Sequence, residues 1–371
     1  FQKTYAQGSG GVFSTTSGTS WGPKISELPN DATYGGNTDN EYTQKFGKQQ
    51  GKYYVPQRAA AGLDPWATPQ AYDNAKDFFD TGITWSNSLN VAQMLDKSSY
   101  SISLGNTHQD GIISSTGMDR YNVKVSADTK LTNNWSSGFT ANYITTSIDK
   151  AVTSGNGLLR TVYAAPPSYD LAGIPSHVDG NPYTQNSFRG SFDNAYWAME
   201  NNKFTEDTNR FFGNVYASYQ TDFGTTNHKL NAKYMVGVDA YTTHYVDSYG
   251  YGSNTGGGRG QIENYGWTNA TYNSLLTINY DWRINEDWGL NAVLGNEIIQ
   301  SNRKKYYEYG TNYNFPGWNH INNATTQQTE EETWKNRTVG FFGNVSASYK
   351  NMLYLTLTGR QDYVSNMPRN N

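Results

Sequence analysis

Apolar and polar residues alternate strictly along many segments of the chain. In segment 120–130, Tyr121, Val123 and Val125 alternate with Asn122 and Lys124. Because successive side chains of a strand point to opposite faces, each such segment predicts a strand with one apolar and one polar face. Eleven strands are expected in this way, and they cover residues 1–7, 82–93, 98–108, 120–130, 134–147, 209–221, 228–243, 268–283, 288–301, 337–349 and 353–364.

Short and long connections alternate between these expected strands. The short ones read MLDK, LTNN, DFGTTN, INED and KNM, whereas the long ones fall near 8–81, 109–119, 148–208, 244–267 and 302–336. A soluble sandwich has no reason to place every short turn at one end of its strands. Short turns at one end and long loops at the other are typical of antiparallel β-barrels of bacterial outer membranes.

A ten-residue phrase occurs twice, as FFGNVYASYQ at 211–220 and as FFGNVSASYK at 341–350. The alternate positions that begin with Phe211 and Phe341 are identical, and both differences fall on the other, polar row. Lipid is a uniform environment, so a row that faces lipid can be reused. We therefore predict that Val215, Ala217, Tyr219, Val345, Ala347 and Tyr349 face lipid. Tyr219 and Tyr349 precede short turns, where an aromatic girdle is expected. Chance repetition or internal duplication is the alternative.

Composition narrows the possible classes of protein. The net charge of −4 offers no basic field for nucleic acid, and the absence of cysteine excludes a disulfide framework and thiol catalysis. The 30 Tyr, 10 Trp and 37 Gly among 371 residues suit many strands separated by irregular loops. An open sheet in hydrocarbon would leave unpaired backbone groups at two edges, so further strands are expected outside this sequence.

One segment of the first long connection departs from the strand pattern. The sequence TPQAYDNAKDFFDTG places Thr68 as an N-cap, Pro69 at the first helical position and Gly82 just beyond the end. It predicts a short helix that leads into the second strand and packs on the barrel wall.

Several segments, in order, resemble the barrel of SusC/RagA-like TonB-dependent transporters. They include YAQGSGGVF, SWGPKI, NAKDFFDTGITWSNSLNVA, NRFFGNVYASYQ, LNAVLGNEI and FFGNVSASYKNMLYLTLTGRQDYVS. The resemblance covers the chain nearly end to end and implies a 22-stranded barrel with a plugged lumen. It implies that residues 1–371 are part of that barrel domain, without the plug, the N-terminal domain, the TonB-contacting segment and the C-terminal strands.

No constellation for catalysis, metal binding or a cofactor emerges. The GTSWG stretch matches the nucleophile-elbow pattern at Ser20, but Pro23 follows where a helix should start. The five histidines are scattered, and the acidic run at 330–332 is typical of a solvated loop, with a bound divalent ion as the alternative. Aromatic residues expected in loops are better candidates, since aromatic faces can stack on a sugar or grip a peptide. These candidates for substrate binding are Tyr196, Trp197, Trp267, Tyr313 and Trp318, and the alternative is that they pack the loops together.

Three functions fit these observations. The first is import of a bulky glycan or oligopeptide across the bacterial outer membrane, energised by TonB; a passive porin and a surface glycan-binding adhesin are the alternatives. The long connections 148–208 and 302–336 are expected outside the cell, where ordering them costs conformational entropy that a second surface could offset. The resemblance implies a SusD-like surface lipoprotein as this partner. Alternatively, the loops fold inward and close the pore.

Overall fold

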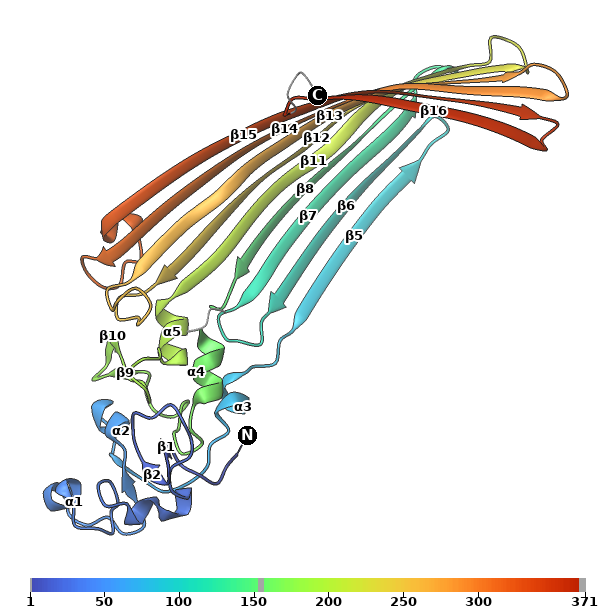
Figure 1. Cartoon of the computed structure of the whole chain (residues 1–371). Coiled ribbons are helices and arrows are strands. Elements are labelled where there is room, and N and C mark those ends of the chain that lie inside the picture. The colour runs from blue at the N-terminus through green and yellow to red at the C-terminus, as the bar shows by residue number, and fades with distance from the viewer. Residues whose placement is uncertain (1, 153–156, 367–371) are drawn as a thin grey trace.

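Ten long strands form one continuous antiparallel sheet in the computed structural model, which describes residues 2–152 and 157–366 (Figure 1). Every strand pairs with its neighbour along the chain, so the sheet is a simple meander. The strands are β5 (Thr84–Met94), β6 (Ser98–Asp110), β7 (Gly117–Lys130), β8 (Trp135–Asp149), β11 (Lys203–Thr221), β12 (His228–Tyr249), β13 (Gln261–Arg283), β14 (Trp288–Tyr313), β15 (Ala324–Tyr349) and β16 (Leu353–Val364). The prediction of an all-β fold with antiparallel hairpins is confirmed, with ten of the eleven expected strands.

Pairing between strands shows that the alternating rows of different strands share one face. Directly paired residues point to the same side of a sheet. Val215 pairs with Phe139 on one side and Val236 on the other, and Val345 pairs with Ala292 and Leu357. The chain of pairs Val215, Val236, Ser274, Ile298 and Val339 joins the two copies of the repeat. We call this the apolar face and the opposite side the polar face.

The short turns gather at one end of the sheet, as the sequence predicts. They link β5 to β6, β7 to β8, β11 to β12, β13 to β14 and β15 to β16 (Figure 1). The last one is tight, since Lys350 and Asn351 both adopt positive φ. The remaining connections all lie at the other end.

Residues 1–7 do not form the first expected strand, which is a correction to the sequence analysis. Residue 1 lies outside the described residues. The segment that follows bonds to residues 20–25 through main-chain groups, such as Ala6 N–H to Pro23 O at 2.8 Å. Ala6 and Gln7 are consecutive and both buried, and the Gln7 amide donates to the Phe188 carbonyl. A segment buried on both sides cannot present one apolar and one polar face.

Four strands are much longer than the alternation predicts, so two expected loops are largely strand. The expected loop 302–336 contains the end of β14 and the start of β15, and only 314–323 connects them. The expected loop 244–267 shrinks likewise to 250–260. In these extensions, which are the strand parts farthest from the short turns and are called the upper parts below, both faces carry polar residues, as in Glu330 to Lys335. Alternation therefore disappears while the hydrogen-bonded register continues.

The connections at the far end fold into a compact unit of their own, which we call the loop module (residues 2–80 and 157–202). It lies beyond the long-loop ends of the strands, opposite the short turns (Figure 1). Its elements are β1 (Gly8–Ser9), β2 (Val12–Phe13), η1 (Ile25–Asn30), α1 (Glu41–Phe46), β3 (Tyr53–Tyr54), α2 (Pro56–Ala60), β4 (Trp66–Ala67), α3 (Asn74–Phe78), α4 (Leu158–Ala164), β9 (His177–Val178), β10 (Asn181–Gln185) and α5 (Ala195–Asn201).

The loop module contains the main buried core of the described chain. Leu28, Phe78, Leu171, Phe188 and Trp197 are all nearly or fully buried and belong to one cluster. Residues from both of its halves contribute, so the two segments fold as one body. No helix within 2–152 and 157–366 is long and apolar enough to cross a membrane.

The expected helix over 68–82 is shorter than predicted, because tertiary contacts override the local signals. Only Asn74–Phe78 is helical, and Asp73 is the N-cap instead of Thr68. The buried Asn74 amide donates to the carbonyls of Pro166 and Tyr169, and its oxygen accepts from Leu171 N–H. These bonds fix where the helix begins, and α3 packs in the loop module instead of on a barrel wall.

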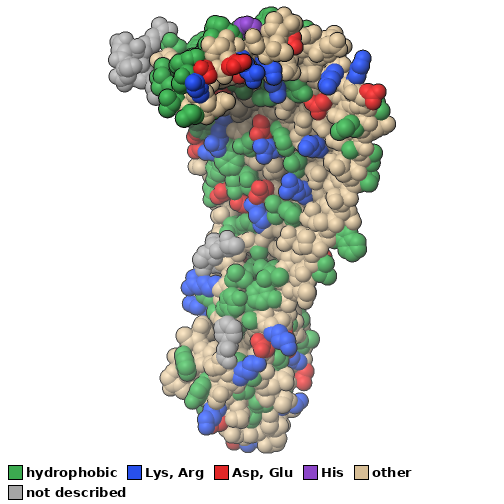
Figure 2. Space-filling view, turned by 90° about the vertical axis from the view of Figure 1, so that its right-hand side faces the viewer, with side chains coloured by type: hydrophobic (Ala, Val, Ile, Leu, Met, Phe, Trp, Pro, Cys, Tyr) green, Lys and Arg blue, Asp and Glu red, His purple; other side chains and the backbone are tan. Residues whose placement is uncertain are grey.

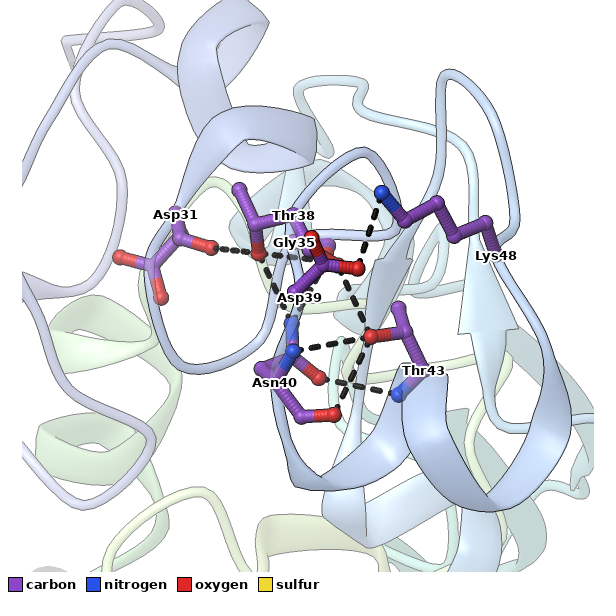
Figure 3. Close-up of polar contacts among 7 residues, drawn as sticks. All are labelled: Asp31, Gly35, Thr38, Asp39, Asn40, Thr43 and Lys48. Atoms are coloured by element: carbon purple, nitrogen blue, oxygen red, sulfur yellow. Dashed lines mark hydrogen bonds and ion pairs between the residues drawn. The ribbon is translucent and has the colours of Figure 1, made fainter.

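Polar side chains tie the outer part of the loop module together (Figure 3). Asn40 caps α1 by accepting from the N–H groups of Tyr42 and Thr43, and the Thr43 hydroxyl accepts from Asn40 N–H. The Asn40 amide also donates to the Gly35 carbonyl at 2.7 Å. Such a capping box satisfies backbone donors that a short helix leaves unpaired.

A buried carboxylate connects the loop module to the loop between β12 and β13. Asp193 accepts from the Ser253 hydroxyl at 2.6 Å and from both the backbone and side-chain N–H groups of Asn254 at 2.8 Å. The Gln185 amide donates to the same carboxylate at 2.7 Å. These hydrogen bonds hold the loop module and the loop at 250–260 together at the end of the sheet.

Candidate substrate-binding wall

The apolar face carries the residues predicted to contact lipid. Val215 and Val345 are about half exposed, as expected for a sheet face with nothing packed on it. Toward the short turns, Trp135 contacts Tyr219 and Trp288 contacts Tyr349, with ring centroids 5.0 and 4.7 Å apart. Both pairs lie on the apolar face next to a short turn, as the residues of an interfacial aromatic girdle would.

Charged residues are confined to one face of the sheet through its lower part. Among the ten described strands, the apolar face carries no Asp, Glu, Lys or Arg from the short turns up to Asp207 in β11, Lys304 in β14 and Arg337 in β15. At the same depth the polar face carries ion pairs: Arg210 with Asp239, and Arg360 with both Glu297 and Asp362. This distribution suits hydrocarbon on one side and water on the other.

Gly340 makes room for the Arg360 network. It lies on β15 between Glu297 on β14 and Asp362 on β16. A Cβ at this position would lie 2.7 Å from a guanidinium nitrogen of Arg360 and 2.5 Å from a carboxylate oxygen of Asp362. The missing side chain allows Arg360 to reach across β15.

Above the apolar band, the polar face bears a cluster of aromatic side chains, which we call the aromatic wall. It consists of Tyr245, Tyr265, Trp267, Tyr307 and Trp334, from four neighbouring strands. Tyr245 and Tyr265 are directly paired and stack with centroids 4.8 Å apart and planes 6° from parallel. Trp267 stands nearly perpendicular to both, at 85° and 89°. The register fixes this arrangement, because all five residues occupy the same alternate row.

Charges of both signs are interleaved with the aromatic wall. Lys150 lies over the Tyr245 ring at 4.8 Å and pairs with Glu206 at 3.3 Å, while Lys305 approaches Glu332 at 3.9 Å. Figure 2 likewise shows basic and acidic side chains interspersed on the surface instead of separated by sign. A surface of this kind offers partners for both positive and negative groups of a ligand.

Two carboxylates lie side by side at the upper end of the wall. Asp247 and Glu263 are directly paired across β12 and β13, and the Tyr265 hydroxyl donates to Asp247 at 3.1 Å. Burial, together with the charge of Asp247, raises the pKa of Glu263. Burial and then the charge of Asp247 also raise the pKa of the Tyr265 hydroxyl. Carboxylates that are partly shielded from water and lie next to aromatic rings can bind a cationic group or a hydroxyl group of a ligand.

The five aromatic residues proposed from the sequence do not form one site. Trp267 belongs to the aromatic wall, although it lies in β13 and not in a loop. Trp197 is fully buried in α5 and donates to the Pro182 carbonyl at 2.8 Å; Tyr313, at the end of β14, is also fully buried. Tyr196 packs edge-on against Phe78, with centroids 5.3 Å apart. Trp318 stacks between Phe315 and His320 in the loop before η2 (Ile321–Asn323).

Sequence reasoning missed most of the aromatic wall because it assigned these residues to loops. Tyr245 and Asp247 on β12, and Tyr265 and Trp267 on β13, occupy the continuation of the odd-numbered rows of these strands. Extending those rows upward would have placed the residues on the polar face. Across residues 2–152 and 157–366, no group of His, Asp and Glu is arranged to hold a metal ion.

Comparison with known proteins finds a relative among TonB-dependent receptors. No family model matches the sequence. The "TonB-dependent receptor P3" of Formosa agariphila is 23% identical over 319 residues, which cover 82% of this chain and 30% of that protein. The resemblance to TonB-dependent receptors seen in the sequence is confirmed at this level, and receptors of this kind reside in the bacterial outer membrane.

Solved structures agree on the fold. The structure of the RagAB peptide importer in the "closed-closed" state matches with a TM-score of 0.65 at 17% identity, over 81% of this chain and 34% of that one. A second structure, described as the RagAB peptide transporter, matches with a TM-score of 0.64 at 15% identity and the same coverage. The chain therefore spans about a third of the proteins that it matches. Its open sheet corresponds to part of a TonB-dependent barrel.

Proposed function

We propose that this chain forms part of the wall and mouth of an outer-membrane transporter that imports oligopeptides into the periplasm with energy from TonB. The observation that carries the proposal is the two-faced sheet. Its apolar face suits lipid, and its polar face holds paired charges and an aromatic wall along the expected lumen. The six residues predicted to face lipid from the repeat belong to this apolar face.

The chemistry of the aromatic wall supports a peptide over a neutral glycan as the substrate. Neutral sugars need aromatic faces and hydrogen-bonding groups, but they do not need charges of both signs. Here Lys150, Arg303 and Lys305 share the wall with Glu206, Asp247 and Glu263. Peptides carry both ammonium and carboxylate groups and aromatic side chains. The solved proteins that share the fold are described as a peptide importer and a peptide transporter.

A partner on the cell surface forms the second part of the proposal. The loop module, with the loops at 250–260 and 314–323, presents a preformed surface beyond the strand ends (Figure 1). We propose that a SusD-like lipoprotein docks there and encloses the substrate above the aromatic wall. The loop module buries its own core, so the partner is not needed to order these loops. The solved assemblies that share the fold are named RagAB.

Uptake by cells tests the transport proposal. A strain that lacks the complete receptor should lose growth on an oligopeptide mixture as nitrogen source, and the restored gene should recover it. Uncoupling the proton-motive force or deleting TonB should abolish uptake of labelled peptide. Uptake that persists without TonB would identify a passive porin, and growth defects on oligosaccharides alone would identify a glycan importer. Elution of the receptor alone from mild detergent, while uptake continues, would contradict the partner.

A further inference from the structure

Arg303 lies between two tryptophans of the aromatic wall. Its guanidinium carbon lies 5.3 Å from the centre of the Trp267 ring and 5.5 Å from that of Trp334. Trp334 is its direct partner on β15, and Trp267 lies diagonally on β13. A guanidinium within about 6 Å of the centre of an aromatic ring is attracted to the ring, which restricts its position while its N–H groups remain able to bind a ligand.

Arg303 differs from the other cations around the wall in having no acidic partner. Lys150 pairs with Glu206 and Lys305 with Glu332, whereas within residues 2–152 and 157–366 Arg303 takes part in no ion pair or side-chain hydrogen bond that the structure resolves. The side chain is exposed. Its five N–H donors form a planar fork that matches a carboxylate.

The depth of Arg303 in the sheet favours contact with a ligand. On the opposite face its neighbours Asn302 and Lys304 are polar, so this level lies above the apolar band. On its own face Arg303 follows upward from Glu297, which is bound by Arg360. Arg303 is thus a cation without an acidic partner on the polar face, above the Arg360 network and toward the mouth of the expected lumen.

We propose that Arg303, oriented by Trp267 and Trp334, is a carboxylate-recognition subsite of the transporter. The inference rests on the proposed import function and adds a chemical group that the substrate must carry. A peptide supplies this group at its C-terminus or on acidic side chains, and an acidic sugar supplies it as a uronate. The two indoles hold the fork open toward the lumen, so a bound carboxylate accepts two parallel N–H bonds.

Retention of defined ligands by the complete receptor in detergent tests the proposal. The probes are short peptides of randomised sequence built from neutral residues, offered together as free acids and as C-terminal amides, and retained species are identified by mass spectrometry. Wild-type receptor should retain the acids about tenfold more than the amides, as the loss of a charge-assisted bidentate contact predicts. Arg303→Gln should retain both equally. Lys304→Gln, changed at the next residue on the opposite face, should keep the preference.

Two further arms make every outcome informative. If Arg303→Gln does not assemble, Arg303→Lys replaces it and should reduce the preference, because a lysine keeps the charge but lacks the fork. Oligogalacturonate and its methyl ester are tested in parallel. Retention of oligogalacturonate, but not of its methyl ester or of the peptides, that depends on Arg303 would support the subsite and contradict the peptide function. Equal retention of acids and amides by wild type, a preference that survives Arg303→Gln, or retention of neither ligand class would overturn the proposal.

Discussion

The sheet and the loop module are stabilised in opposite ways. The loop module buries Leu28, Phe188 and Trp197 in a core of its own, as a water-soluble domain does. The strands bury almost nothing in their lower halves, and Val215 and Leu357 remain 52% and 67% exposed. A soluble fold cannot leave so large an apolar surface open to water. The difference indicates that the apolar face of the sheet suits a lipid environment, whereas the loop module is stabilised by its own packing.

Removal of a core side chain from the loop module should give the largest effect and separate the two regions. Phe188 is fully buried, so Phe188→Ala should destabilise the module by about 3–5 kcal/mol. Hydrogen exchange should quicken in residues 157–202 and stay unchanged in β11–β16. Phe315→Ala, at a ring that is 51% exposed, is the matched control. Faster exchange throughout the sheet would show that the two regions do not fold independently.

A charge on the apolar face should affect the sheet alone. Val345→Arg should impair assembly in the outer membrane by about 2–4 kcal/mol, because an arginine near the bilayer midplane loses its hydration. Ser346→Arg, one residue later on the polar face, should assemble. Heat-modifiable migration on gels reports assembly for both variants. If the two variants assemble equally, or Ser346→Arg is the worse, the assignment of the faces is wrong.

Loss of the cap on α1 should produce a smaller, local effect. Asn40→Ala removes the oxygen that accepts from the N–H groups of Tyr42 and Thr43, and it should cost about 0.5–2 kcal/mol. It also removes the amide that donates to the Gly35 carbonyl and the Thr38 hydroxyl (Figure 3). Proteolysis should then cleave residues 31–52 faster while the sheet stays intact. Gln44→Ala changes an exposed residue of the same helix and should leave the cleavage rate unaltered.

The smallest expected effect is a dependence on pH at the upper ends of β12 and β13. The pKa of Glu263 is raised above its ordinary value of 4.5 by burial and by Asp247. The folded state therefore binds this proton more tightly than the unfolded state, so local stability increases as pH falls through the raised pKa toward 4.5. The protection factors of residues 261–265 against hydrogen exchange, which are corrected for the intrinsic effect of pH on exchange, should increase over this interval. Glu263→Gln should remove the dependence, and an unchanged profile in that variant would assign it to another group.

Alternation predicted the sheet only where the two faces meet different solvents. Between lipid and water the pattern identifies ten strands and their common face, as the rows through Val215 and Val345 show. Above the bilayer both faces are wet, so the extensions that carry Tyr265, Trp267 and Trp334 leave no alternating signal. In the loop module, Asn74 and Gln7 are fixed by long-range bonds that no local pattern encodes. Extending the rows of single strands places Tyr265, Trp267 and Trp334 on the polar face, and the register between four strands brings them together in the aromatic wall.

The most direct test of the account is the side of the membrane on which each region lies. Single cysteines in this cysteine-free chain, within the complete receptor, can be labelled on intact cells with an impermeant thiol reagent. Gln44 in the loop module and Asn322 in the loop before β15 are exposed and should label as cysteines. Cysteines at Thr226 and Met352, in two short turns, should label only after the outer membrane is opened. Labelling of the turns on intact cells, with none at positions 44 and 322, would contradict the account.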